Sequence, residues 1–225
     1  LSILSSLAFG CKSNVENFFT EGIKNISHID IEMAKKLGYR IVLLGISSFV
    51  KERLTQRVHP CMIPVSSIIS KVNGVLNTVI IEGDLINKTI LIGEGAGSKA
   101  TTSSVISDII DIANSSNYRA FGVLSKNLKT PLLSSFSERT GKFYIRLLVN
   151  DIPGVVADVS MCFKEANVSI ASLIQLDNSD HKSKFIPLVF TTHESSENEI
   201  NLALSKISKL GSIKDKPNLV RIESL

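Results

Sequence analysis

Residues 143–176, FYIRLLVNDIPGVVADVSMCFKEANVSIASLIQL, hold the clearest succession of elements in this 225-residue chain. Residues 143–149 are apolar enough for a strand, and the turn-forming NDIPG follows them. Apolar side chains at helical spacing come next: Val155, Val159, Cys162, Phe163 and Ala166. Residues 168–176 form a second apolar run. The stretch therefore predicts a strand, a helix and a second strand.

The residues after this stretch predict the same elements again. Residues 177–184 (DNSDHKSK) are polar and favour a hairpin loop, after which residues 185–193 predict a third strand. Ser196-x-x-Glu199 matches a capping box, which predicts the start of a second helix. Residues 218–222 predict a fourth strand. The order βαββαβ is that of the ferredoxin-like, split-βαβ arrangement.

Residues 1–113 mix helices and strands. The opening LSILSSLAFG favours a helix entered in mid-course, and residues 32–37 favour a short helix that Gly38 ends. Residues 39–45 favour a strand, and the polar residues 51–58 favour a surface strand or a turn. Residues 77–81 and 88–92 predict an antiparallel pair around a Glu-Gly-Asp turn. Residues 114–142 lack periodicity and are rich in Ser, Asn, Lys and Thr, which is typical of a partly ordered connection. We therefore expect an α+β chain with a mixed-sheet unit, a linker and a ferredoxin-like unit.

Charge and cysteine usage exclude several classes of protein. The net charge is +4, from 25 basic and 21 acidic residues, and no basic run resembles a phosphate-tracking stripe. The three cysteines lie far apart without C-x-x-C spacing, which disfavours a disulfide framework or structural zinc and fits a reducing cytoplasm. The first ten residues are too short to span a bilayer and lack the basic flank of a signal peptide.

The glycine-rich GEGAG, residues 93–97, fails both common nucleotide motifs. A Walker loop needs Gly-Lys-Ser/Thr at its end, and a Rossmann fingerprint needs a third glycine where Ser98 stands. Closely spaced glycines still let a ligand approach the backbone, and the amides at a helix start favour anions. A tight strand-to-helix turn without a ligand is the equally weighted alternative.

His59, in RVHPCMIP, could act as an acid, a base or a ligand. We find no second histidine, cysteine or carboxylate at a helpful spacing, so a buried, hydrogen-bonded histidine is favoured over catalysis. Glu21 and Asp30 near a helix start, like Glu82 and Asp84 near a turn, are expected to have solvated capping or turn roles. The NDIPG turn offers free amides to an amino-acid carboxylate or is an ordinary strand-to-helix turn.

Six segments follow one another much as in bacterial homoserine dehydrogenase, a family that the chain resembles over nearly its whole length. They are ILSSLAFG, EGIKNI-x-x-x-D, AKKLGY, RVHPCMIP, VNGVLNTV-x-x-EGD and GEGAG-x-x-ATTSSV-x-x-D. FYIRLLVNDIPGVVADV and PLVFTTH resemble the family's C-terminal ACT domain. The likeness is weakest across residues 114–142.

The resemblance implies an oxidoreductase that reduces L-aspartate 4-semialdehyde to L-homoserine with NAD(P)H, in threonine, methionine and isoleucine biosynthesis. In the family, a Rossmann domain and the segment with the catalytic Lys and the substrate-contacting Asp and Glu residues precede the position of Leu1. We therefore expect a C-terminal portion: residues 1–113 from the catalytic and dimerisation domain, 114–142 a linker, and 143–225 an ACT regulatory domain. Such a portion holds no catalytic residue, binds no cofactor tightly and is inactive alone.

The resemblance also implies two sites. Gly95, Ala96 and Gly97 are expected to face the cofactor in the full-length enzyme. An amino-acid effector, expected to be threonine, would bind at these residues: Asn150, Asp151, Ile152, Gly154, Val155, Asn167 and Ser169. The effector would act by biasing the orientation of the ACT domain.

The partners follow from the same resemblance. Strands at 39–45 and 77–92 resemble those on which two subunits pair, which implies a homodimer or tetramer with no nucleic-acid or membrane partner. A stand-alone amino-acid-sensing protein is the alternative. Apolar residues at 1–9 and 105–112 argue against it, because they would lack a packing partner.

Overall fold

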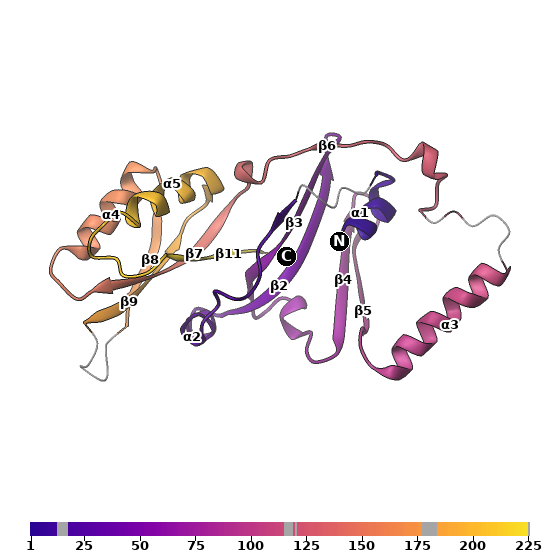
Figure 1. Ribbon diagram of the computed structural model, residues 1–225, viewed down its shortest axis with the longest axis horizontal. Helices are drawn as coiled ribbons and strands as arrows, with labels where there is room; N and C mark the ends of the chain where they lie inside the picture. Colours follow the sequence, from indigo (N-terminus) through magenta and orange to yellow (C-terminus); the bar gives the residue numbers. More distant parts are fainter. Residues whose placement is uncertain (13–17, 115–118, 120, 177–183, 225) are drawn as a thin grey trace.

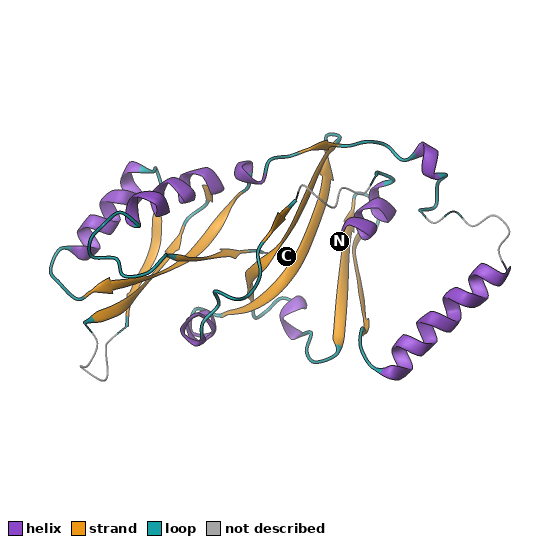
Figure 2. Cartoon of the chain, viewed as in Figure 1, coloured by secondary structure: helices purple, strands orange, loops and turns teal. Residues whose placement is uncertain are grey.

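One large mixed sheet runs through the middle of the molecule (Figure 1, Figure 2). The computed structural model describes residues 1–12, 18–114, 119, 121–176 and 184–224. Neighbouring strands in the sheet are, in order, β1 (Phe19–Thr20), β3 (Arg53–Pro64), β11 (Asn218–Ile222), β7 (Thr140–Asn150), β9 (Phe185–Thr192) and β8 (Ile170–Gln175). Three further strands join it: β2 (Tyr39–Val50) and β6 (Leu132–Leu133) beside β3, and β10 (Ser195–Ser196) beside β7.

Strand β3 organises the first half of this sheet. It pairs antiparallel with β2 over its whole length and continues through Pro60 to Pro64, so residues 53–64 are one strand. Lys51 and Glu52, both with positive φ, form the turn that joins β2 to it. Its other edge is filled by three two-residue segments, all parallel to it. β6 lies beside Arg53 and Leu54, β1 beside Arg57 and Val58, and β11 beside Cys61 and Met62.

The C-terminal module, residues 140–224, has the predicted order of elements. Helix α4 (Val155–Glu165) follows β7, and helix α5 (Glu197–Ile207) begins at Ser196 with both bonds of the capping box. The strands lie in the order β11-β7-β9-β8, antiparallel throughout, as the split-βαβ arrangement requires. The predicted hairpin loop at 177–184 lies outside the described residues except for Lys184.

Two cores cover opposite faces of the sheet. Side chains alternate along β7, so Phe143, Ile145 and Leu147 point to α4 and α5, whereas Tyr144 points the other way. Helix α2 (His28–Lys36) packs on that second face, where Met33 and Ala34 share a core with module residues and with β3: Met62, Tyr144, Val189, Val220 and Ile222. The C-terminal module is therefore fused to the first half by a common core.

Helix α2 begins earlier than expected. The sequence suggested a short helix at 32–37, but Ser27 and Asp30 form a capping box that starts it at His28. Gly38 ends it with a left-handed φ of 80°, as predicted.

The end of the molecule away from the C-terminal module is thinly covered, because few of its side chains are buried. Strands β4 (Leu76–Gly83) and β5 (Asn87–Glu94) form the predicted antiparallel pair, and α3 (Ser98–Asn114) extends away from it (Figure 1). None of the residues of α3 is buried. Helix α1 (Ser2–Phe9) buries Ser2, Ser5 and Ser6 and exposes its apolar side chains: Ile3, Leu4 and Leu7.

The segment between the two halves is largely ordered where it is described. A 3₁₀ helix at Ser125–Asn127 precedes β6, and a second, η3 (Phe136–Glu138), leads into β7. Another 3₁₀ helix, η1 (Ile69–Lys71), lies outside this segment, between β3 and β4. No helix among the described residues is long and apolar enough to cross a membrane.

Candidate functional site

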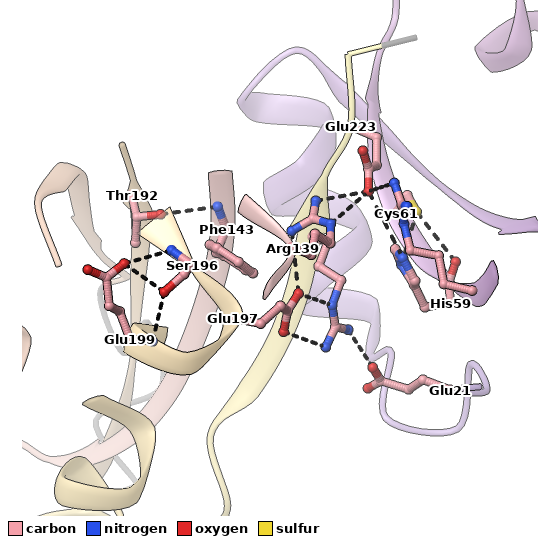
Figure 3. A network of polar contacts seen from close by, with 12 residues as sticks. Glu21, His59, Cys61, Arg139, Phe143, Thr192, Ser196, Glu197, Glu199 and Glu223 are labelled. Carbon is pink, nitrogen blue, oxygen red and sulfur yellow. Dashed lines mark hydrogen bonds and ion pairs between the residues drawn. The ribbon is translucent and has the colours of Figure 1, made fainter. Parts of the chain in front are cut away.

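A buried cluster of charged residues lies where β3, β11 and β7 meet, and Figure 3 shows it from close by. We call it the junction cluster. Three carboxylates face three guanidinium groups in it: Glu21, Glu197 and Glu223, with Arg57, Arg139 and Arg221. The pairing of equal numbers of opposite charges is what makes their burial tolerable.

Arg221, on β11, is the centre of the cluster and is 4% exposed. Its Nε and Nη2 donate to the two oxygens of Glu197 at 2.7 and 3.2 Å, and its Nη1 donates to Glu21 at 2.6 Å. The guanidinium also lies over two aromatic rings, 4.6 Å from the centroid of Phe19 and 5.1 Å from that of Phe136. Those two rings stack on each other, so Arg221 packs against both and stabilises the contact of η3, which carries Phe136, with β1, which carries Phe19.

Glu223 holds the second half of the cluster. Its Oε1 accepts from Arg139 Nη2 at 2.8 Å, from Arg139 Nε at 3.2 Å and from Arg57 Nη2 at 3.3 Å. Arg139 also donates to Glu197 at 3.3 Å. The network thus links the last turn before β7, the start of α5, the end of β11 and strand β3.

His59 and Cys61 lie side by side at the edge of this network and are fully buried. His59 Nδ1 is 3.2 Å from Cys61 Sγ and 3.1 Å from the Pro60 carbonyl oxygen. Burial lowers the pKa of His59 to about 4 and raises the pKa of Cys61 to about 12, so both are neutral at pH 7. The prediction of a buried, hydrogen-bonded histidine is confirmed.

The expectation that no cysteine or carboxylate at a helpful spacing accompanies His59 is wrong, because Cys61 and Glu223 both lie beside it. Residues i and i+2 of a strand share a face, so Cys61 could have been found from the sequence. Glu223 is distant in sequence, and only the tertiary fold brings its Oε1 to 4.0 Å from His59 Nε2, a nitrogen that has no hydrogen-bond partner among the described residues.

These three residues place potential metal ligands within 4.8 Å of one another. A cation there would face the guanidinium groups of Arg57 and Arg139, which already bind Glu223. It would also need the thiolate of Cys61, which its raised pKa disfavours. The junction cluster therefore joins the strands through hydrogen bonds and ion pairs.

A second charged contact ties α2 to the C-terminal module on the opposite face. Asp30 is fully buried, and its carboxylate accepts from Arg146 Nε at 2.7 Å, Arg146 Nη2 at 3.2 Å and Tyr144 Oη at 3.0 Å. It also accepts from Ser27 in the capping box. Burial opposes ionisation of Asp30, but these bonds outweigh it and lower its pKa.

The solvated roles expected for the four carboxylates hold only in part. Asp30 caps a helix as predicted but is buried, because Arg146 and Tyr144 approach it from β7. Glu21 precedes the helix by several residues and pairs with Arg221 instead. Glu82 forms an exposed ion pair with Lys88 across the hairpin at 2.9 Å.

The GAG turn, Gly95 to Gly97, joins β5 to α3 as predicted. Gly95 donates its N–H to the Val75 carbonyl, and a Cβ there would overlap the side chain of Asn77. Gly97 has a φ of 115°, which favours glycine. The turn is exposed on the thinly covered end of the molecule, away from the strands that hold the junction cluster (Figure 1).

The predicted effector residues fall into two groups. Asn150 to Val155 run from the end of β7 through the turn to the first residue of α4, and Gly154 in that turn has a φ of 94°. Asn167 and Ser169 lie after the other end of that 11-residue helix, about 16 Å away by its rise per residue. Within one chain the structure therefore does not bring the two groups together.

Comparison with known proteins assigns the family. The family model for homoserine dehydrogenase matches residues 1–110. Homoserine dehydrogenases of Helicobacter pylori and Neisseria gonorrhoeae are 37% and 34% identical over the whole chain, which covers 52% and 53% of their lengths. The crystal structure of a homoserine dehydrogenase from Thiobacillus denitrificans superposes with a TM-score of 0.85 at 31% identity, over 99% of this chain and 51% of that one.

The chain belongs to the homoserine dehydrogenase family. It spans about half the length of the curated relatives it matches. The likeness to the Thiobacillus denitrificans homoserine dehydrogenase extends through the C-terminal module, so that the junction cluster and the α2 contact lie inside the matched region. The family resemblance noted from the motifs is thus confirmed.

Proposed function

We propose that this chain serves in a homoserine dehydrogenase, which reduces L-aspartate 4-semialdehyde to L-homoserine with NAD(P)H. Family membership over the full chain supports the reaction class. The three free cysteines, all buried, fit a reducing compartment such as the cytoplasm.

The exposure of α3 supports the proposal that this chain packs against a cofactor-binding domain. Its 17 residues follow the GAG turn directly, and four branched aliphatic side chains on it are each about half exposed: Val105, Ile106, Ile109 and Ile110. A helix of this composition without a buried residue lacks the tertiary packing that usually stabilises helices. We assign this face and the outer face of α1 to contact with a nucleotide-binding domain, with Gly95, Ala96 and Gly97 toward the cofactor.

The β4-β5 pair supports a role in assembly. It is a two-stranded ladder whose apolar side chains are largely exposed, among them Leu91 at 57% and Ile92 at 51%. Two-stranded ladders are marginally stable alone and gain from added strands. A homodimer built on this ladder, or a tetramer, is part of the proposal.

The C-terminal module is proposed to be an ACT domain that binds an amino acid, with threonine as the expected effector. The Asn150–Val155 turn and the Asn167–Ser169 segment are its proposed contacts. Because α4 separates them within one chain, one ligand would touch both groups only if two copies of the module lie side by side.

An activity assay tests the dehydrogenase proposal. The chain is joined to the N-terminal half of the Helicobacter pylori relative, and NADPH oxidation is followed with aspartate semialdehyde. We expect turnover from the joined protein and none from the 225-residue chain alone. A folded joined protein without turnover would contradict the proposal, and turnover by the chain alone would contradict the absence of catalytic residues from it.

A further inference from the structure

The first turn of α5 connects a proposed effector residue to the junction cluster. Asn167 has a left-handed backbone, and its Nδ2 donates to Glu199 Oε1 at 3.1 Å. The other oxygen of Glu199 accepts from the backbone N–H and the hydroxyl of Ser196, at 2.7 and 2.9 Å. One carboxylate therefore holds both Asn167 and the cap of α5.

The same turn carries Glu197, which is fully buried in the junction cluster. Figure 3 shows Glu199 and Glu197 on either side of this turn, one near Ser196 and the other facing the arginines. From Glu197 the bonds run to Arg139 and Arg221, from Arg139 to Glu223, and from Glu223 to Arg57 on β3. Hydrogen bonds and the backbone of this turn thus form a continuous path from Asn167 at the module's surface to β3.

The joint that these contacts cross is short. β11 pairs with β3 through only two residue pairs, Arg221 with Cys61 and Ile222 with Met62. The backbone ladder is therefore a small part of this connection, which depends mainly on side chains: the common core with α2, the Asp30 contact and the junction cluster. Buried charges must keep their partners, because leaving one unpaired is costly. A shift of Glu197 therefore obliges Arg139 and Arg221 to follow it.

We propose that the first turn of α5 relays occupancy of the amino-acid site to strand β3 through the junction cluster. An amino acid that takes the Asn167 amide as its own donor removes that bond from Glu199. The cap of α5 then relaxes, and Glu197 and its two arginines transmit the change to Glu223 and Arg57. Glu197 and Glu199 act as positioning residues, and the inference rests on the proposed effector role of Asn167.

Amide hydrogen exchange in the full 225-residue chain, with and without L-threonine, tests the relay. We expect threonine to change exchange of the β3 amides between Arg57 and Cys61 about fivefold, the lower end of usual couplings between sites. Glu199→Gln should still bind threonine, as measured by calorimetry, but lose that response. Glu165→Gln is the matched control, since it removes an exposed carboxylate that pairs with Lys206 outside the cluster.

The outcomes distinguish failure of the relay from failure of the proposed effector site. Threonine binding without a β3 response in the unsubstituted chain overturns the relay and leaves the effector site standing. If threonine, serine, isoleucine and methionine all fail to bind, the effector proposal falls. The ligand-free exchange of Glu199→Gln then decides the relay. Altered β3 exchange relative to Glu165→Gln supports the mechanical link, and identical exchange overturns it.

Discussion

Replacing Asp30 by asparagine should show how strongly α2 holds the C-terminal module. The carboxylate is fully buried and accepts five hydrogen bonds, from Ser27, Tyr144 and Arg146. Asparagine has nearly the same shape but no charge, so Arg146 would be left without its partner. Breaking a buried ion pair costs about 3–5 kcal/mol, and the 18% exposure of the Arg146 side chain moves the expectation to about 3 kcal/mol.

The assay is urea unfolding of the full chain, followed by circular dichroism at several pH values. Because the folded-state pKa of Asp30 is lowered, its stabilisation is complete above the unfolded-state value of about 4 and fades as the pH falls further. The gap between the two proteins should therefore be largest at pH 7 and shrink toward pH 3. Asp84→Asn, at an exposed turn, is the control for a lost charge.

The reasoning also predicts a partial recovery. Asp30→Asn combined with Arg146→Met should be more stable than Asp30→Asn alone, because no buried guanidinium is left unpaired. A loss below about 1 kcal/mol at pH 7, or a gap that is the same at pH 7 and pH 3, would refute the assignment of this contact as a charged tie.

Three further substitutions follow from the structure. His59→Gln should lessen the loss of stability between pH 6.5 and pH 4. Because the folded-state pKa of His59 is lowered, its protonation favours the unfolded chain and reduces the free energy of unfolding by up to about 3 kcal/mol at pH 4. An unchanged pH profile of stability in the variant would contradict this. Gly154→Ala places a side chain at a φ of 94° and should weaken threonine binding in calorimetry, and unaltered affinity would move the effector site elsewhere. Ser196→Ala removes the cap of α5 and should cost about 1 kcal/mol in urea unfolding, whereas Ser208→Ala at the exposed end of the helix serves as the control.

Most elements of the C-terminal module could be predicted because their signals are local. The stripe from Val155 to Ala166 and the capping box at Ser196 each lie within a few turns of helix, and both are observed. A proline inside a strand pattern predicts a bulge or a strand end, but Pro187 lies within β9 and pairs with Leu148 without a break in the ladder. The candidate sites were less predictable, because the partners of His59 and Asp30 come from β11 and β7.

The sequence by itself determined the helices, most strands and the family, since amphipathic spacing, caps and linear motifs are properties of neighbouring residues. Only the tertiary structure decided how the two halves join. Three segments from residues 19–20, 132–133 and 221–222 complete one edge of β3, and Asp30 and Arg146 meet across 116 positions. Backbone pairing and charge pairing depend on distance in space, which no local pattern records.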